Sequence, residues 1–232
     1  MNQKTVMITG ASGGLGAAIA RRFAHEKSNL ALVGRNGDIL NTVSSGILSE
    51  HPDIAIENYT VDFRDHKDTL AFLENDIRVD VLVNCAGVFP LKNLEASTND
   101  DYEECFDVNV RAPFLLVNKF CKGMKHRRWG RVVNVCSSSS YSGSAESGLY
   151  CSSKHALLGL SRSQYLELKP HNIRVFSVSP GSIQTAMGAT DFRQNFSTFV
   201  RPEEVADYIV YMTNFDKEMI SEEVRLNRVS VE

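Results

Sequence analysis

Short apolar segments alternate with segments of helical periodicity along the chain, and this alternation limits the possible folds more than any other feature. The apolar segments are rich in Val, Ile and Leu, which is typical of strands buried on both faces. They span residues 6–9, 30–33, 54–61, 79–84, 131–136 and 173–178. Helical patterns lie between them at 15–26, 38–50, 65–75, 100–126 and 152–169. We predict an α/β fold with a doubly wound parallel sheet of about seven strands and helices on both faces.

The length of 232 residues suits one large domain, and we expect residues 1–232 to form it. A last strand is expected near residues 223–229, where polar and apolar residues alternate. Residues 184–200 are irregular and precede a helix that opens at Arg201-Pro202. A loop of this length is often a lid, so we expect a substrate loop there. Its three phenylalanines either form a pocket wall or pack on one another: Phe192, Phe196 and Phe199.

Composition excludes several classes of function. The net charge is -3, with 43% hydrophobic and 23% charged residues, so the sequence carries no electrostatic signature of nucleic-acid binding. The basic cluster at residues 122–131 is better explained as cations at the C-terminus of a helix. No apolar run reaches the roughly 20 residues of a membrane span. The N-terminus enters a strand pattern without a secretory signal, so we expect a cytoplasmic protein that binds neither nucleic acid nor membrane.

The five cysteines are an odd number without C-x-x-C spacing, and we expect reduced, mostly buried thiols. We predict no metal site. Cys151 lies beside a tyrosine of interest below; it is either a reactive thiol or, the better explanation, a small packing residue.

A glycine-rich turn joins the first strand to the first helix. It reads Thr9-Gly10-Ala-Ser-Gly-Gly14-Leu-Gly16, with spacing G-x-x-x-G-x-G. Such a turn lets backbone N–H groups and the helix dipole meet a pyrophosphate, so we predict a dinucleotide site. The alternative is a tight turn without a ligand.

The tip of the second strand suggests which dinucleotide is used. An acid there binds the ribose 2′-hydroxyl of NAD, whereas an arginine accommodates the 2′-phosphate of NADP. This strand ends at Gly34-Arg35-Asn36 without an acid, so Arg35 favours NADP(H). Asp38 is the rival, but it resembles a residue at a helix N-terminus.

Tyr150 and Lys154 are four residues apart, which puts them on one face of a helix. A free phenol has a pKa of about 10, and a fixed ammonium nearby lowers such a value. The pair therefore suggests a proton-transfer site. A serine cluster, Ser137 to Ser140, lies just upstream.

Together these motifs resemble the short-chain dehydrogenase/reductase family, in order and over nearly the whole chain. The glycine turn matches the family's cofactor loop, and Asn84-Cys-Ala-Gly87 its N-x-A-G segment. Asp62 matches an aspartate that contacts adenine, and Asn109 a helix asparagine. Pro180-Gly181-Ser-Ile183-Gln-Thr185 resembles the segment over the nicotinamide. The resemblance implies a Rossmann fold and hydride transfer between NADP(H) and a carbonyl or alcohol.

The resemblance also implies a role for individual residues. Tyr150 would be the general acid, Ser137 would bind the substrate oxygen, and Lys154 would assist Tyr150 and bind the nicotinamide ribose. Asn109 would hold a water that links Lys154 to solvent. Ser137 is preferred because it is the second residue after the strand's last aliphatic position and thirteen residues before Tyr150, with Ser139 as a distant second. The implied cofactor-binding residues are Gly10, Ser12, Gly14, Leu15, Gly16, Arg35, Asp62, Asn84, Ala86, Gly87, Tyr150, Lys154, Pro180, Gly181, Ile183 and Thr185.

Substrate and assembly are less determined. The substrate is a small carbonyl or alcohol: a 3-oxoacyl thioester, a sugar or polyol, a hydroxy acid or a small ketone. A non-catalytic NADP(H)-binding sensor or scaffold is the alternative function, and an epimerase or dehydratase a third. Two departures from the family pattern are Cys85, where Asn is common, and a C-terminus without the usual glycine-containing tail. The second departure puts in doubt the family's usual tetramer contacts and any role of the tail in shaping the substrate site, although a homodimer or homotetramer is still expected.

Overall fold

The computed structural model describes residues 3–191, 193–218 and 220–229, and in these ranges seven strands form one parallel sheet. The strands are β1 (Thr5–Thr9), β2 (Asn29–Gly34), β3 (Ile56–Thr60), β4 (Val81–Asn84), β5 (Gly130–Val135), β6 (Ile173–Pro180) and β7 (Glu223–Leu226). Their order is β3-β2-β1-β4-β5-β6-β7, so the chain winds outward from β1 and then crosses back to β4. The predicted doubly wound sheet is confirmed.

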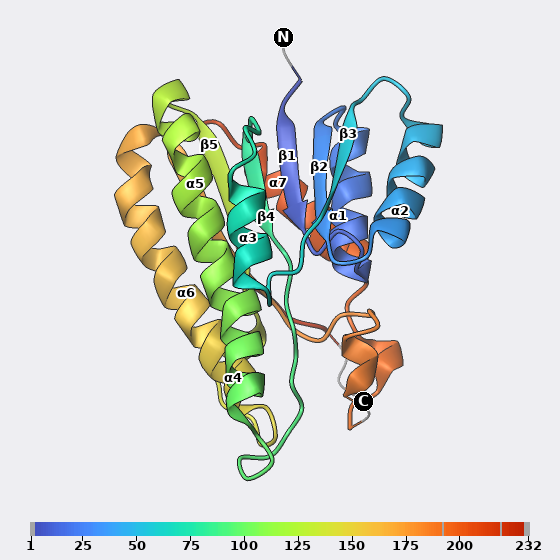
Figure 1. The fold of residues 1–232 in the computed structure, drawn as a ribbon, viewed down its shortest axis with the longest axis vertical. Coiled ribbons are helices and arrows are strands. Elements are labelled where there is room, and N and C mark those ends of the chain that lie inside the picture. The colour runs from blue at the N-terminus through green and yellow to red at the C-terminus, as the bar shows by residue number, and fades with distance from the viewer. Residues whose placement is uncertain (1–2, 192, 219, 230–232) are drawn as a thin grey trace.

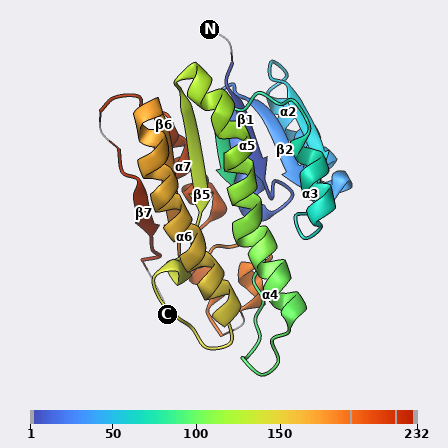
Figure 2. The same ribbon diagram turned by 60° about the vertical axis from the view of Figure 1, so that its left-hand side comes forward.

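Helices cover both faces of the sheet (Figures 1 and 2). One face carries α3 (His66–Leu73), α4 (Asn99–Phe106), α5 (Ala112–Arg127) and α6 (Gly148–Leu168). The other carries α1 (Gly14–His25), α2 (Gly37–Glu50) and α7 (Pro202–Thr213). Helices α1 and α2 thus follow each other on one face, and α3 to α6 lie on the other after the strand order reverses, which gives the helix–sheet–helix layers of a doubly wound sheet.

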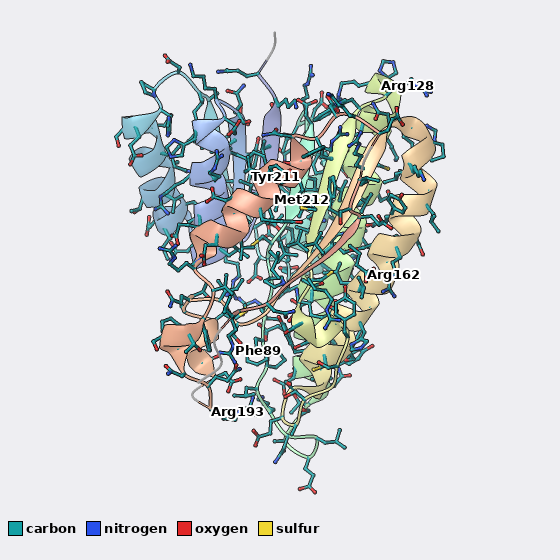
Figure 3. All side chains as sticks on the ribbon, turned by 180° about the vertical axis from the view of Figure 1, so that it is seen from behind. Phe89, Arg128, Arg162, Arg193, Tyr211 and Met212 are labelled. Carbon is teal, nitrogen blue, oxygen red and sulfur yellow. The ribbon has the colours of Figure 1, made fainter. Side chains whose placement is uncertain are left out.

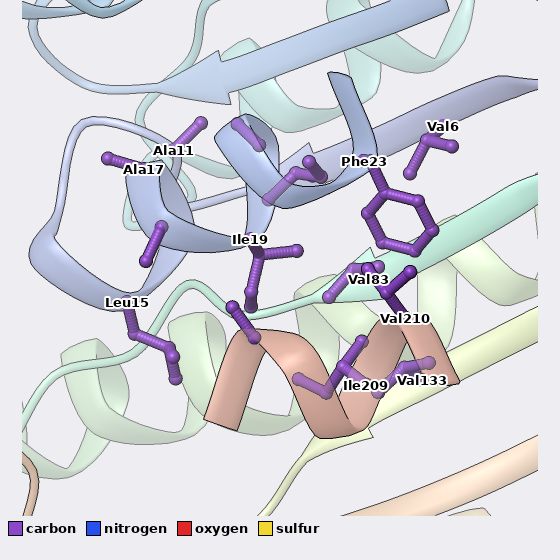
Figure 4. Close-up of a cluster of buried hydrophobic side chains, with 14 of the residues drawn as sticks. Val6, Ala11, Leu15, Ala17, Ile19, Phe23, Val83, Val133, Ile209 and Val210 are labelled. Atoms are coloured by element: carbon purple, nitrogen blue, oxygen red, sulfur yellow. The ribbon is translucent and has the colours of Figure 1, made fainter. Parts of the chain in front are cut away.

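The strands are apolar throughout because each contributes to two cores. Val6 and Ile8 of β1 belong to the core beneath α1 and α7, whereas Met7 belongs to the core beneath α3 and α5. In Figure 4, Ile19 and Phe23 of α1 pack with the side chains of α7 over the sheet. Successive side chains point to opposite faces of a strand, so a strand between two helical layers needs apolar residues at every position.

One predicted helix contains a π-helical turn that was not predicted, and the start of another was placed too late. Residues 100–126 form α4, a π-helical turn (Asp107–Arg111) and α5 in direct succession, where one helix was expected. Helix α6 begins at Gly148 and not at residue 152, so Tyr150 and Lys154 both lie on it. Its first turn, Gly148-Leu-Tyr-Cys, contains glycine and few strong helix formers, which explains why local propensity places the start too late.

Residues 184–200 are irregular as predicted, with short 3₁₀ turns at Gly188–Thr190 and Phe196–Thr198. Phe199 is buried, and its ring lies 5.3 Å from that of the half-exposed Phe196, so these two pack on each other. Phe192 lies outside the described residues. Among the described residues, no helix is both long and apolar enough to cross a membrane.

Candidate active site

A cavity of about 750 Å³ opens at the carboxyl edge of the sheet. Its wall comes from the loops after β1, β2, β4, β5 and β6 together with the 184–200 loop. Strand order reverses between β1 and β4, which is where doubly wound sheets leave a crevice for a ligand. Most of the predicted site residues line it: Gly10, Ser12, Gly14, Leu15, Gly16, Arg35, Ala86, Gly87, Ser137, Tyr150, Lys154, Pro180, Gly181, Ile183 and Thr185.

The glycine loop is packed so closely that side chains are excluded. Gly10 has φ +69°, and a Cβ on it would lie 2.8 Å from the Cα of Ala86. A Cβ on Gly16 would lie 2.2 Å from the carbonyl oxygen of Gly10. Thr9 ties the loop to the end of β4, because its hydroxyl oxygen accepts the N–H groups of Cys85 and Ala86, both at 3.0 Å. These positions therefore require glycine for backbone shape and for close approach.

The first turn of α1 has free backbone donors that face the cavity. Gly13 precedes the helix without a side-chain cap, and the first turn contains no acid. In contrast, Asn36 caps α2 and Asp65 caps α3 through their side chains. Uncapped N–H groups at a helix N-terminus attract an anion. The loop therefore fits the pyrophosphate of a dinucleotide.

Arg35 follows β2, is exposed and lines the cavity. Within the described residues Arg35 forms no ion pair. Hydrogen bonds from Arg64 hold the pKa of Asp62 below its usual range, and the charge of Arg35 makes a smaller contribution in the same direction. Asp38 is the second residue of α2 and does not line the cavity, as expected for a helix N-terminal residue. The cavity thus has an uncompensated guanidinium where the adenosine end of a dinucleotide is expected.

Tyr150 and Lys154 lie one turn apart on α6 and share the cavity wall. The Lys154 side chain is buried, its ammonium donates to the Val135 carbonyl at 2.9 Å, and its Nζ lies 5.7 Å from the Tyr150 ring centre. The Tyr150 hydroxyl has no hydrogen-bond partner among the described residues. The phenol therefore faces the cavity beside a positive charge held by the end of β5.

Ser137 lies two residues beyond β5. Its Oγ accepts the N–H of Ser139 at 3.1 Å, and its own N–H donates to the Ser140 Oγ at 3.2 Å. Ser138 and Ser139 also line the cavity, whereas Ser140 is buried within the turn. These contacts orient the Ser137 oxygen and leave its proton available to a ligand.

Asn109 lies behind the cavity wall. It belongs to the π-helical turn, is fully buried, and exchanges two hydrogen bonds with the backbone of Val88 at 2.9 and 3.0 Å. Its Nδ2 also donates to the Ser153 Oγ of α6 at 3.0 Å. A Cβ on Gly87 would lie 3.3 Å from the Asn109 Oδ1 and 3.8 Å from the Lys154 Nζ. The π turn thus brings this amide toward Lys154, in line with the frequent occurrence of π turns at functional sites.

Two predicted cofactor residues are not part of the cavity wall. The Asp62 carboxylate accepts hydrogen bonds from the Arg64 side chain at 2.9 and 3.0 Å. Asn84 is buried and donates to the Asn134 Oδ1 at 2.7 Å. Both side chains serve here to hold neighbouring segments, and their contact with a cofactor stays a prediction.

Residues 4–195 match the family model described as short chain dehydrogenase. The chain belongs to the short-chain dehydrogenase family. It is 31% identical over 189 residues to an uncharacterised oxidoreductase of Bacillus subtilis, covering 81% of this chain and 74% of that protein. It is 30% identical over 224 residues to 3-oxoacyl-(acyl-carrier-protein) reductase of Aquifex aeolicus, covering 90% and 89%. A metagenomic short-chain oxidoreductase in complex with NADP superposes with a TM-score of 0.85 at 28% identity, covering 98% of each chain. The chain is therefore an oxidoreductase of this family, and the roles of the individual cavity residues stay predictions.

Three side chains that the sequence reasoning did not single out also line the cavity of this short-chain dehydrogenase: Phe89, Asp191 and Arg193. Phe89 packs edge to face on Tyr150, with ring centres 4.7 Å apart. Arg193 pairs with Asp191 at 2.7 Å and with Glu146 at 3.0 Å, which links the 184–200 loop to the segment before α6. Figure 3 shows Phe89 and Arg193 at the same end of the molecule. No local spacing along the sequence predicts the ion pair between Arg193 and Glu146, because these two residues are 47 positions apart.

The last described residues of the chain also reach the cavity. Asn227 and Arg228 line it. Arg228 donates to the Thr198 Oγ1 at 3.1 Å and to the Gln194 Oε1 at 2.8 Å, so the tail holds the 184–200 loop.

The cysteines of the described chain are free. Burial raises the pKa of the Cys85 thiol to about 12 and that of Cys136 to about 11. Cys151 is buried and does not line the cavity, which favours a packing role over a reactive one.

Proposed function

We propose that this short-chain dehydrogenase is an NADP(H)-dependent enzyme that transfers hydride between the nicotinamide and a carbonyl or alcohol. One observation carries the proposal. Tyr150, the buried Lys154 and Ser137 line the same cavity as the uncapped N-terminus of α1. A proton donor and an anion-binding helix end in one cavity are what reduction of a carbonyl by a phosphorylated cofactor requires.

The cofactor would be held by the glycine loop at its pyrophosphate and by Arg35 at a 2′-phosphate. The absence of an ion pair at Arg35 in the described chain supports NADP over NAD, because a phosphate would compensate the exposed guanidinium. The related metagenomic structure with NADP supports the same choice. When bound, the nicotinamide supplies or accepts the hydride.

The chain's own residues would handle the proton and the substrate oxygen. The Tyr150 hydroxyl would donate a proton to the carbonyl oxygen, and the Lys154 charge would stabilise the negative charge left on the phenol oxygen. The Ser137 hydroxyl would donate to the substrate oxygen, where charge develops. Asn109 would hold the Val88 backbone and α6 in register; its proposed role in binding a water stays a prediction.

The substrate would enter between the 184–200 loop, the Glu146 segment and Phe89. The Arg193–Glu146 and Arg228–Gln194 contacts hold the loop against the segment before α6 and against the C-terminal residues, which supports a lid role for the loop. Phe199 lines the same region, so an apolar substrate portion would lie against it.

The decisive experiment follows NADPH oxidation with a panel of carbonyl compounds. The panel contains a 3-oxoacyl thioester, small ketones, keto acids and sugars. The thioester is included because the relative from Aquifex aeolicus is named as a 3-oxoacyl-(acyl-carrier-protein) reductase. We expect NADPH-dependent turnover of at least one class, and much weaker turnover with NADH. Tight NADPH binding with no turnover on any compound would instead favour a non-catalytic binding protein.

We also propose that two copies pair through α4, α5 and α6. An apolar groove on these helices is lined by Tyr102, Phe106, Val110, Phe114 and Leu160. Tyr102 and Phe114 are 47% and 48% exposed, so pairing would remove large apolar side chains from water. Light scattering of the purified chain is expected to give a dimer or tetramer mass; a stable monomer at micromolar concentration would contradict it.

A further inference from the structure

A second group of chemically reactive side chains lies at the opposite edge of the sheet from the cavity. His25 is the last residue of α1, Glu50 is the last residue of α2, and His51 follows directly. Their ring nitrogens and carboxylate oxygen all lie within 4.8 Å of one another. The C-terminal ends of α1 and α2 lie at the end of the molecule that carries the N-terminus (Figure 1).

These side chains have no use in the rest of the fold. Within the described ranges, none of the three side chains forms a hydrogen bond or an ion pair. The two imidazoles meet edge to face with ring centres 4.5 Å apart. The Nε2 of His51 is buried without a hydrogen-bond partner, although buried polar atoms are nearly always satisfied. This nitrogen therefore has a lone pair or a proton that no group of the described chain uses, and it is available to a ligand.

The surroundings favour a cation. Two helices end at this point, and each presents the negative end of its dipole and its free carbonyl groups. Glu50 adds a carboxylate charge. Arg22, three residues before His25 on α1, is already paired with Glu26 at 2.7 Å and with Asp207 at 2.8 Å, so its charge is compensated.

We propose that His25, Glu50 and His51 bind a divalent transition-metal ion, with zinc as the best match. Two imidazoles and a carboxylate are ligands that zinc accepts, whereas calcium and magnesium prefer oxygen alone. Zinc bonds of about 2.0–2.1 Å in a tetrahedron separate ligand atoms by about 3.3 Å. Rotation of the two exposed side chains, His25 and Glu50, closes the observed separation. Water fills the fourth position.

The bound ion would link the end of α1 to the end of α2. These helices belong to the unit that also carries the glycine loop, so the link would stabilise the cofactor-binding half of the sheet. Because an ion that binds only the folded chain raises its stability, the inference predicts a zinc-dependent melting temperature. It does not depend on the proposed reaction.

The test uses the full chain without a histidine tag, stripped of metal by a chelator and titrated with Zn²⁺ in a calorimeter. We expect one ion per chain and a higher melting temperature with zinc. His25→Gln and His51→Gln should each weaken binding by about tenfold or more. The matched control is His126→Gln, an exposed histidine at the end of α5, which should change neither value.

Binding of Co²⁺ distinguishes this site from one formed by the cysteine side chains. Co²⁺ bound to nitrogen and oxygen gives d–d absorption without the thiolate charge-transfer band that cysteine ligands produce. Glu50→Gln should keep the fold and weaken the binding, because it changes one exposed oxygen ligand. Absence of zinc binding, binding unchanged in the His25→Gln/His51→Gln double variant, or a thiolate band would each overturn the proposal.

Discussion

The two edges of the sheet use arginine in opposite ways. At the carboxyl edge, Arg35 is exposed, lines the cavity and forms no ion pair within the described chain. At the amino edge, Arg131 is fully buried, stacks on Trp129 at 4.4 Å and pairs with Asp216. Its Nη atoms also donate to the carbonyl oxygens of Gly130 at 2.7 Å and Phe215 at 3.3 Å. The same side chain is thus available to a ligand at one edge and committed to the fold at the other.

The difference follows from what surrounds each charge. Burial lowers the pKa of Arg131 to about 10, and the carboxylate and carbonyl groups around it offset the loss of water. Nearby, the last turn of α5 is basic as the sequence predicts, and Arg127 donates to the Val79 carbonyl at 2.6 Å. The carboxyl edge instead leaves donors unused, at Arg35 and at the uncapped start of α1. The Nη groups of Arg131 are thus committed to the fold, and its Nε alone is buried without a hydrogen-bond partner in the described chain, whereas the donors at the carboxyl edge face the cavity.

The largest expected effect concerns Tyr150 at the carboxyl edge. Tyr150→Phe removes the proposed proton donor and no hydrogen bond within the described chain, so turnover should fall about 10²–10⁴-fold while the melting temperature and NADPH affinity stay nearly unchanged. Steady-state kinetics measure the turnover, and fluorescence titration measures the NADPH affinity. Tyr211→Phe, at an exposed position of α7, is the control and should keep full activity. A Tyr150→Phe enzyme with nearly normal turnover would show that another group donates the proton.

The next effect concerns Arg35. Loss of a charge-assisted contact costs about 1.5–3 kcal/mol, so Arg35→Ala should raise the Kd for NADPH about ten- to a hundredfold. Affinity for NADH should hardly change, because NADH lacks the 2′-phosphate. Arg21→Ala, an exposed arginine of α1 outside the cavity, serves as the control. An unchanged preference for NADPH would remove Arg35 from the site and weaken the contrast between the two edges.

The smallest effect concerns Arg131 at the amino edge. Arg131→Met removes the ion pair with Asp216 and the hydrogen bond to the Gly130 carbonyl, and should lower the free energy of unfolding by about 1–3 kcal/mol. NADPH affinity of the folded protein should stay unchanged. The control Arg162→Met removes a partly exposed ion pair with Glu223 and should cost less than about 1 kcal/mol. Urea denaturation measures the free energy of unfolding of both variants. An equal decrease in the two variants would mean that the burial of Arg131 does not make its contribution to stability larger than that of Arg162.

Local sequence patterns predicted the sheet and the helices, and the motifs together with the family resemblance named fifteen of the residues that line the cavity. The glycine loop could be recognised because its spacing is set by one short turn, and Tyr150 and Lys154 because they are one helical turn apart. The π-helical turn at Asp107–Arg111 was not predicted, because a shift in backbone hydrogen bonding leaves no apolar period. Asp62 and Asn84 were found by motif, but motif alone did not reveal their engagement with Arg64 and Asn134.

The sequence by itself determined the alternation of strands and helices, the glycine turn and the spacing of Tyr150 and Lys154, because these depend on neighbours along the chain. Only the tertiary structure decided which charges are compensated. Arg193 meets Glu146 across 47 positions, and Arg131 meets Asp216 across 85. It also brought His25 to Glu50 and His51, from the ends of two different helices. These contacts depend on how the helices and strands pack in three dimensions. The periodicity of residues along the chain does not determine that packing, so it could not predict which side chains meet.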